Sequence, residues 1–384
     1  REDDCEAFGL CGGRALRHLS YESELTAKRN FVQDAFKRLG GFSLDIPPCT
    51  PSPEIDRYRN KVQYPLTTTP SGRVTYGFYA TRSHRVVSCA DCRLQPTVLN
   101  EIAAFLCQLF TAYSITVYDE RTHKGTLRHL YLRRGAHSGE IMVCIVVNGN
   151  GVSGEIEIVK ELTEQYPDVK TVLINSNRED TNIVLGRKFR TIWGDGFIHD
   201  TLCDIPVTLA APSFYQVNTP GAEKLYALAA EFASPTPDDL LLDLYCGTGT
   251  IGLSMAHRVK QLVGVEIVPE AVQDAEQNAR AAKITNATFF AADAAAAADK
   301  MAEEGLLPSI IVLDPPRKGC EDATLAAVLK MAPKKIVMVS CNAATAARDA
   351  KHLAAHGYAL KKVQPLDMFP RTKHVECVTL LVKE

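Results

Sequence analysis

Short apolar runs alternate with amphipathic stretches from about residue 240 to the end of the chain. The apolar runs are rich in Val, Ile and Leu, as buried strands are, whereas the intervening stretches contain the Ala, Leu and charged residues that favour helices. This alternation predicts βαβ units in a doubly wound parallel sheet, which an antiparallel hairpin closes. The expected strands are 240–244, 261–267, 287–291, 309–313, 335–340, 359–365 and 375–382, and the expected helices are 251–258, 270–283, 294–304, 323–331 and 343–356.

The part of the chain before residue 206 has a less regular pattern. Apolar runs at 141–147 and 171–175 predict strands, and residues 97–111 predict a helix. Residues 17–39 have the spacing of an amphipathic helix, for which Ser20 is a candidate N-cap. We therefore expect three segments, with a cysteine-containing segment and helix at 1–46, a mixed α+β domain at 47–205 and an α/β domain at 206–384.

Composition places the chain among ordinary globular proteins, since 46% of its 384 residues are hydrophobic and 23% are charged. No apolar run approaches the roughly 18 to 20 residues that cross a bilayer, and the charged first residues have no signal-peptide character. We therefore expect a cytoplasmic protein with no membrane partner. In a reducing cytosol its 12 cysteines would be thiols, metal ligands or nucleophiles.

Charge is divided unevenly along the chain. Residues 1–137 carry 19 Lys and Arg against 14 Asp and Glu, whereas the remainder carries 24 against 31. A basic half joined to an acidic half is what a phosphate-binding lobe beside a catalytic lobe would show, although an ordinary solvated surface gives the same count.

A glycine-rich turn follows the first expected strand of the α/β domain. Gly247 and Gly249 belong to a GxGxxG string, and Glu266 ends the next strand, where a carboxylate can bind ribose hydroxyls. A nicotinamide dehydrogenase would show the same string, and so would a purely structural tight turn. Two residues favour S-adenosylmethionine instead, since Asp243 could reach the ammonium group of the methyl donor and Asp293 could reach the adenine amino group.

Asp314 and Cys341 follow the fourth and fifth expected strands. Ligands of open α/β sheets bind beyond the carboxyl ends of the strands, so both residues should share a crevice with the glycine turn. A thiol is informative here because uracil C5 is not nucleophilic, whereas an exocyclic amine is. A thiolate that adds to C6 activates C5 for methylation, and a base must then remove the C5 proton so that the thiol can leave.

Glu376 offers the carboxylate that this chemistry requires, and it stands in the apolar final strand. Each residue also has a plain structural interpretation. Cys341 could be a buried small hydrophobic residue, and Glu376 could be a surface charge on an edge strand. The combination with Asp314 and the glycine turn favours the chemical interpretation.

These motifs resemble those of the RNA uracil-C5 methyltransferases typified by the bacterial 23S ribosomal RNA enzymes, and the resemblance covers nearly the whole chain. It implies a class I, Rossmann-like methyltransferase domain at 206–384, preceded by an RNA-binding α+β domain at 47–205. The matching strings are Tyr58-Arg59-Asn60-Lys61, Cys92-Arg93-Leu94-Gln95-Pro96, Leu127-Arg128-His129-Leu130, Thr181-Asn182, Ser213 to Asn218, Asp243 to Gly249, Asp314 to Gly319, Ser340-Cys341-Asn342 and His374-Val375-Glu376.

The resemblance assigns roles to individual residues. It makes Cys341 the nucleophile and Glu376 the proton acceptor, and it gives Phe214 and Gln216 to the pocket of the target uridine. Phe214 and Tyr215 could also be core aromatic residues. Because C5 and C6 of a stacked base are inaccessible, we expect the uridine to be flipped out of a loop. Contacts to the donor fall to Gln216, Tyr245, Glu266, Asp314 and Asp293, together with Asp243, Gly247 and Gly249 of the turn.

The chain departs from the family pattern at a metal site. Many members hold a [4Fe–4S] cluster with a Cys-x5-Cys-Gly-Gly-Cys string and a further cysteine in the Cys-x-Leu-Gln string. Here Cys5, Cys11 and Cys92 match, but Arg14 replaces the remaining ligand, and a cubane cluster normally needs four thiolates. Cys89 is a candidate substitute. The sequence leaves open both a bound cluster and an empty site.

We therefore expect a monomeric RNA uracil-C5 methyltransferase that uses S-adenosylmethionine, with 23S ribosomal RNA as the favoured substrate and a transfer-RNA loop second. The family often carries an N-terminal β-barrel RNA-binding domain, which would have been trimmed here or is lacking in this member. A nicotinamide-linked oxidoreductase is an alternative that gives no role to Cys341 and Glu376. Another is a non-catalytic RNA-binding or iron–sulfur protein that keeps a methyltransferase fold.

Overall fold

A seven-stranded sheet with the strand order β12-β11-β10-β13-β14-β16-β15 is the centre of the C-terminal part of the chain in this computed structural model, which describes residues 5–13 and 15–384. Strands β10 to β14 run parallel to one another, and β16 pairs antiparallel with both β14 and β15. The predicted doubly wound sheet and its closing hairpin are confirmed. The strands are β10 (Leu240–Leu244), β11 (Gln261–Glu266), β12 (Ala287–Ala291), β13 (Ile310–Leu313), β14 (Lys335–Ser340), β15 (Tyr358–Leu366) and β16 (Glu376–Lys383).

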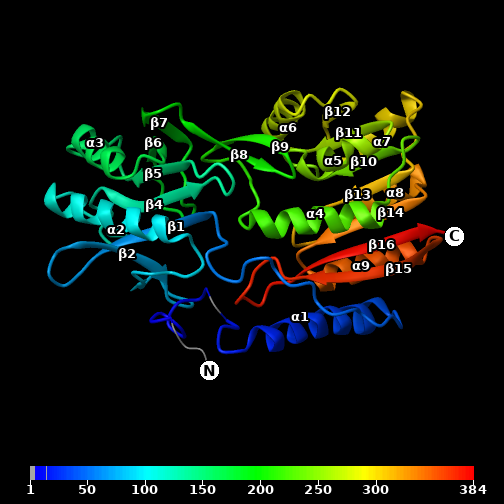
Figure 1. Cartoon of the computed structure of the whole chain (residues 1–384), viewed down its shortest axis with the longest axis horizontal. Coiled ribbons are helices and arrows are strands. Elements are labelled where there is room, and N and C mark those ends of the chain that lie inside the picture. The colour runs from blue at the N-terminus through cyan, green and yellow to red at the C-terminus, as the bar shows by residue number, and fades with distance from the viewer. Residues whose placement is uncertain (1–4, 14) are drawn as a thin grey trace. The chain divides into compact units, whose positions relative to one another are not determined.

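Helices between these strands cover the sheet (Figure 1). Residues of α1, α7, α8 and α9 share one hydrophobic cluster with the sheet, whereas α5 and α6 pack on β10 to β12 outside that cluster. The direction of winding changes at β10, which lies between β11 and β13, and such a switch point opens a crevice at the strand ends. The helices are α1 (Tyr21–Ala35), α4 (Thr219–Ala233), α5 (Thr250–Met255), α6 (Pro269–Ala281), α7 (Ala294–Glu303), α8 (Asp322–Met331) and α9 (Ala343–Ala354), with a π-helical turn η1 (Phe36–Gly40) and a 3-10 turn η2 (Ala256–Arg258).

A second seven-stranded sheet, in the order β3-β2-β1-β4-β5-β6-β7, belongs to the earlier part of the chain. All its pairings are antiparallel except that of β5 with β6. Strand β5 is buried along its whole length, as its unbroken apolar run predicts. The elements are β1 (Lys61–Thr68), β2 (Val74–Tyr79), β3 (Val86–Ser88), α2 (Thr97–Ala112), β4 (Leu127–Arg134), β5 (Ile141–Val147), α3 (Glu155–Gln165), β6 (Val169–Ser176) and β7 (Lys188–Trp193), and a separate two-stranded sheet joins β8 (Phe197–Leu202) and β9 (Ile205–Ala210).

The chain divides into two compact units that are not continuous in sequence. Unit 1 comprises Arg1–His18, Glu54–Thr201 and Thr208–Thr219, and unit 2 comprises Leu19–Pro53, Leu202–Val207 and Pro220–Glu384. The sequence had suggested continuous segments instead. Helix α1 belongs to unit 2 because its apolar side, including Val32, packs into the core of the α/β sheet.

Local signals for α1 are largely as predicted. Ser20 is the N-cap, and its hydroxyl accepts a hydrogen bond of 3.2 Å from the Ser23 amide. The helix is shorter than expected, because residues 36–40 form a π-helical turn that ends at Gly41 with a φ of 77°.

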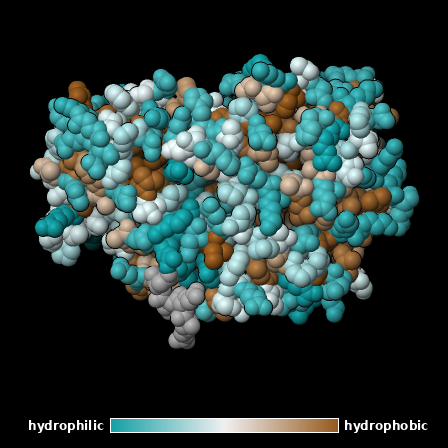
Figure 2. Space-filling view, in the orientation of Figure 1, coloured by the Kyte–Doolittle hydropathy of each residue, from teal (hydrophilic) through white to brown (hydrophobic). Residues whose placement is uncertain are grey.

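No helix in the described part of the chain is long and apolar enough to cross a membrane. Figure 2 shows a largely hydrophilic face on which hydrophobic residues occur in small groups. Scattered exposed apolar residues of this kind are normal for globular proteins and do not indicate a binding site.

Candidate active site

The turn after β10 brings backbone close to where a ligand of this fold would bind. Tyr245, Gly247 and Gly249 all have positive φ angles, of 63°, 53° and 78°. A positive φ is costly for a side chain such as Tyr245, and such residues concentrate at functional sites. Gly252, at the start of α5, has no room for a side chain, since a Cβ there would lie 2.9 Å from the Asp243 carboxylate.

Carboxylates from two strands stabilise this turn. The amides of Gly247 and Val268 donate to the two oxygens of Glu266 at 3.2 and 3.0 Å. Asp243 is fully buried, and its Oδ2 accepts the Gly252 amide at 2.9 Å. Its Oδ1 has no hydrogen-bond partner among the described residues. Burial raises the pKa of Asp243 to about 7, and the nearby Asp314 and Glu266 add to this effect.

Asp293 lies at the end of β12, as predicted, and is exposed. Its Oδ1 accepts the Ala296 amide at 2.8 Å, so it also caps the first turn of α7. The structure therefore gives this residue a local role, and its contact with adenine stays a prediction.

Strand register brings Cys341 and Glu376 together although 35 positions separate them in the sequence. Ser340 at the end of β14 pairs with Cys377 on β16. Continuing this antiparallel register by one residue places Cys341 opposite Glu376, and facing side chains of this kind lie about 5 Å apart. Asp314 directly follows β13, the neighbour of β14, so the three residues meet at one end of the sheet.

Burial and mutual repulsion keep these acidic groups protonated at a higher pH than usual. Burial raises the pKa of Glu376 to about 8, and Asp314 contributes further. Burial also raises the pKa of Asp314 to about 7. The pKa of the Cys341 thiol is raised by burial, by Glu376 and by Asp314. Arg317 acts in the opposite direction on both Cys341 and Glu376, which identifies it as their nearby cation.

The loops that carry Cys341 and Arg317 are tied to each other. Asn342 donates from Nδ2 to the Arg317 carbonyl at 3.0 Å, and its Oδ1 caps α9 by accepting the Ala344 amide at 3.1 Å. Cys341 therefore lies at the N-terminus of a helix, whose dipole favours a thiolate. Arg317 and Asn342 belong to the matched strings, but the sequence predicts no role for either residue. Their roles follow from residues that are close to them only in the folded protein.

The raised pKa of Glu376 predicts a pH-dependent effect on stability. In the folded protein this carboxyl holds its proton up to about pH 8, against an ordinary value of 4.5, so wild type should lose stability as pH rises between these values. Glu376→Gln cannot titrate, and we expect it to be more stable than wild type at pH 8.5 by on the order of 1 to 4 kcal/mol. Denaturant unfolding at pH 5 and 8.5 measures the difference, which should nearly vanish at pH 5. Glu270→Gln, at an exposed position, is the matched control, and an equal effect of both substitutions would contradict the prediction.

Phe214 and Gln216, which the sequence assigned to the pocket of the target uridine, belong to a segment of unit 1 that hydrogen bonds hold in place. Phe214 is 65% exposed, so the core interpretation does not describe it, whereas it does describe the buried Tyr215. Arg133 donates to the carbonyls of Ala210 at 2.9 Å and Ser213 at 2.7 Å. Asn60 donates to the Gln216 carbonyl at 2.8 Å. This hydrogen bond involves the backbone of Gln216 and not its side chain.

The cysteines considered for an iron–sulfur cluster pack in one small hydrophobic cluster of unit 1. Cys89 and Cys92 are buried in it, and Cys5 and Cys11 pack against it. Nevertheless, no group of three or more His, Cys, Asp or Glu side chains among residues 5–13 and 15–384 is arranged to hold a metal ion. Arg14 lies outside the described residues. Of the two possibilities that the sequence left open, a bound iron–sulfur cluster is therefore not supported by the part of the chain that the structure describes.

Known proteins resemble this chain over nearly its whole length. Residues 204–384 match the family described as tRNA (Uracil-5-)-methyltransferase. The whole chain is similar to uncharacterized RNA methyltransferases, with 42% identity to one from Oceanobacillus iheyensis over 97% of this chain and 81% of the relative. A relative from Halalkalibacterium halodurans is 40% identical over 99% of this chain and 83% of the relative. Among solved structures, Pyrococcus abyssi tRNA (uracil-54, C5)-methyltransferase in complex with S-adenosyl-L-homocysteine matches with a TM-score of 0.79 and 27% identity, over 97% of this chain and 86% of that chain.

Proposed function

The chain belongs to the RNA uracil-5-methyltransferase family, and from this premise we propose that it methylates C5 of a uridine in RNA through a covalent adduct with Cys341. The observation that supports the proposal is the pairing of Ser340 with Cys377, which brings the adjacent Cys341 and Glu376 to the same end of the sheet, where Glu376 raises the pKa of the Cys341 thiol. A thiol and a carboxylate are the two groups that C5 methylation of a pyrimidine requires. The nicotinamide alternative gives this pair no role, whereas the matching family and the relatives are RNA methyltransferases.

S-adenosylmethionine, when bound, supplies the methyl group. The residues at the glycine turn fit such a donor, because the turn exposes backbone and Glu266 retains lone pairs for ribose hydroxyls beside its two amide contacts. We propose that Tyr245, Gly247, Gly249 and Asp314 complete this site. Gln216, Asp293 and Asp243 are further proposed contacts, with Asp243 Oδ1 as an acceptor for the donor's ammonium group.

Cys341 performs the first covalent step in this proposal. Its thiolate adds to C6 of uracil, the C5–C6 double bond opens, and the ring becomes an enolate whose C5 can take the methyl group. Arg317 and the N-terminus of α9 stabilise the thiolate, which otherwise suffers from burial and from the neighbouring carboxylates.

Glu376 completes the reaction. As a carboxylate it accepts the proton from the methylated C5, the electron pair re-forms the C5–C6 double bond, and the bond between C6 and the Cys341 sulfur breaks to release the thiolate. Phe214, exposed on its anchored segment, is the proposed stacking surface for the flipped uridine, and Gln216 is the proposed polar contact.

The RNA target is the finer part of the proposal. We propose a loop uridine of 23S ribosomal RNA as the first candidate, from the resemblance of the motifs. A transfer-RNA loop is the second candidate, and the names of the matching family and of the Pyrococcus abyssi structure favour it. Release of tritium from each RNA, labelled at uridine C5 and mixed with protein and S-adenosylmethionine, tests the chemistry and identifies the substrate. Absence of release from both RNAs, by folded protein that binds S-adenosylhomocysteine, would favour the non-catalytic RNA-binding alternative.

The electrostatics of the site predict how activity depends on pH. Cys341 and Glu376 must both be deprotonated, and since the pKa of each is raised, kcat/KM should increase from pH 6 to 9. Arg317→Met removes the cation that lowers both pKa values, so we expect its profile to move to higher pH and its kcat/KM at pH 7.5 to fall by about tenfold or more. Lys318→Met, at the exposed neighbouring position, is the control and should keep the wild-type profile. A loss of activity in Arg317→Met that is equal at pH 7 and 9 would contradict this electrostatic role.

A further inference from the structure

A lysine on α1 is completely buried in unit 2, and it contacts two carboxylates. Lys28 has no exposed surface, and its Nζ donates to Glu24 Oε1 at 2.7 Å and to Asp367 Oδ1 at 2.6 Å. A third hydrogen bond, of 3.1 Å, goes to the carbonyl of Phe369. Asp367 and Phe369 belong to the segment that connects β15 to β16, so Lys28 ties α1 to a segment about 340 positions later in the chain.

Glu24 also contacts Arg371, in the middle of the segment that connects β15 to β16. Its Oε1 accepts the Arg371 amide at 2.6 Å, and the Arg371 guanidinium lies 3.8 Å from Oε2. Arg371 has a φ of 69°, a conformation that a non-glycine residue adopts only when its surroundings hold it. We call Glu24, Lys28, Asp367 and Arg371 the Lys28 cluster. It contains two positive and two negative side chains, all buried.

Net stability does not explain the Lys28 cluster. Removing four charged groups from water is unfavourable, and apolar residues of similar size often stabilise a fold as well or better. Burial raises the pKa of both Glu24 and Asp367, whereas the contacts with Lys28 act in the opposite direction. What such a cluster does supply is a fixed geometry for the backbone that it holds.

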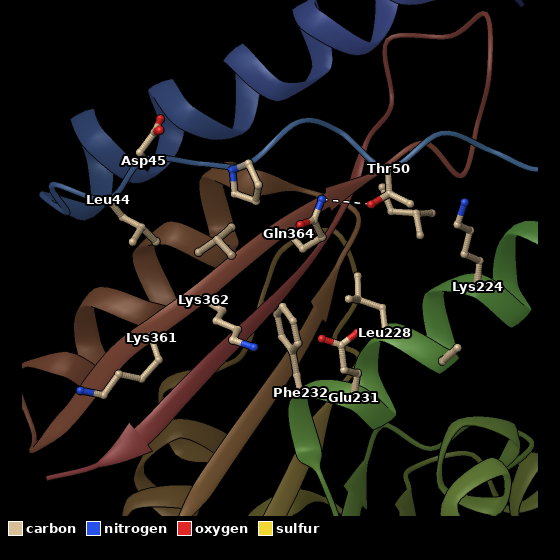
Figure 3. Close-up of a pocket in the computed structure, with 14 residues that line it drawn as sticks. Leu44, Asp45, Thr50, Lys224, Leu228, Glu231, Phe232, Lys361, Lys362 and Gln364 are labelled. Atoms are coloured by element: carbon tan, nitrogen blue, oxygen red, sulfur yellow. Dashed lines mark hydrogen bonds between the residues drawn. The ribbon is translucent and has the colours of Figure 1, made fainter.

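Residues 44–53, which follow α1 and η1 and which we call the N-terminal arm, contact the end of β15. Thr50 forms a parallel bridge with Leu366, with its amide donating to Pro365 and its carbonyl accepting from Asp367, both at 2.9 Å. Figure 3 shows this arm beside β15, with Gln364 Nε2 donating to Thr50 Oγ1 at 3.0 Å. The N-terminal arm therefore forms hydrogen bonds to the residues on either side of Leu366, where β15 ends.

The held segment leads directly to the proposed base. Asp367 is the first residue after β15, and Glu376 is the first residue of β16, paired with Leu366. Cys341, in contrast, is positioned by β14 and by the N-cap of α9. Disturbing the Lys28 cluster should therefore displace the carboxylate more than the thiol.

Accordingly, we propose that Lys28 is a positioning residue for Glu376, and that the Lys28 cluster fixes this carboxylate for removal of the C5 proton. The inference rests on the proposed uridine-C5 chemistry. It predicts a selective defect in the last step, because adduct formation and methyl transfer depend on Cys341, whereas release of the product depends on where Glu376 lies.

Lys28→Met tests this idea, since it keeps most of the aliphatic stem and removes the ammonium group. Lys37→Met, at an exposed position just after α1, is the matched control. Because Lys28→Met leaves the two buried carboxylates of the Lys28 cluster with Arg371 as their one remaining cation within that cluster, it could unfold the protein. Lys28→Met/Asp367→Asn therefore serves as a second, charge-balanced variant. For each protein we would measure thermal unfolding, binding of S-adenosylhomocysteine, multiple-turnover methylation and the fraction of RNA in a complex that survives denaturing gel electrophoresis.

We expect the Lys28 variants to bind S-adenosylhomocysteine like wild type, to lose about 10- to 100-fold in multiple turnover, and to accumulate methylated RNA attached to protein. Lys37→Met should behave like wild type. Unchanged turnover, reduced turnover without attached RNA, or loss of folding in both Lys28 variants would each overturn the positioning role. Failure of the proposed function is distinguishable, because wild type would then release no tritium and Glu376→Gln would trap no RNA, and the inference would fall with it.

Discussion

Cys341→Ala should abolish the release of tritium from C5-labelled uridine RNA, with a fall in turnover of at least about 10⁴-fold. Without the thiolate no bond forms to C6, and C5 stays too poor a nucleophile to take a methyl group. The fold should tolerate the change, because Cys341 is half-buried and directly follows the end of β14. Tritium release and incorporation of labelled methyl groups measure the effect.

Cys203→Ala is the matched control for this experiment, since Cys203 is also half-buried and belongs to the same unit. Both variants should unfold at the wild-type temperature to within a few degrees and bind S-adenosylhomocysteine equally well. Tritium release by Cys341→Ala at the wild-type rate would show that another group attacks C6, or that none does.

Glu376→Gln should separate the two halves of the reaction. The amide cannot accept the C5 proton, so methyl transfer should proceed once and the methylated RNA should stay bound to Cys341. We expect multiple turnover to fall by about 10³-fold or more and an RNA–protein complex to persist on a denaturing gel. The measurement is the fraction of protein shifted on that gel, with labelled methyl groups in the shifted band.

The double variant Glu376→Gln/Cys341→Ala is the control for trapping, since it retains the amide and lacks the sulfur. It should show no shifted band. If Glu376→Gln instead turns over normally, another base removes the proton, and Asp314, which raises the pKa of Glu376, is a candidate.

The role proposed for Glu376 implies a conflict between function and stability. Its burial, at 7% exposed, raises its pKa and destabilises the folded protein at alkaline pH, where the carboxylate is charged. The same burial makes the carboxylate a stronger base than an exposed glutamate. A variant that is more stable and inactive would be the expected result of relieving this conflict.

Much of unit 2 was predictable from the sequence because its signals are local. In a parallel βαβ arrangement each buried strand is a short apolar run, so the strand positions and the order of elements could be recognised one segment at a time. The glycine turn, Asp314 and Cys341 each stand at the end of such a run, and the rule that ligands bind at strand ends was enough to group them. Glu376 was predicted from the carboxylate that C5 chemistry requires and from its place in an otherwise apolar final strand.

Other features of the site depend on residues that meet only in space. Phe214 and Tyr215 are adjacent aromatic residues that no local pattern distinguishes, yet one is exposed and the other is buried. Arg317 could be recognised as the cation of the site only when Cys341 and Glu376 were placed near it. The four cysteines of unit 1 do gather, as the strings suggested, but whether thiols can surround an ion is a question of geometry that spacing does not answer.

By itself, therefore, the sequence determined the α/β architecture, the family and the residues most suited to chemistry, because periodicity and turn motifs act over a few residues. Tertiary structure alone decided that α1 belongs to the α/β unit and that Lys28 is buried against Asp367. It also decided that β14 and β16 bring Cys341 opposite Glu376. The physical reason is that a pairing register and a buried ion cluster depend on contacts between distant segments, and such contacts leave no periodic mark in the sequence.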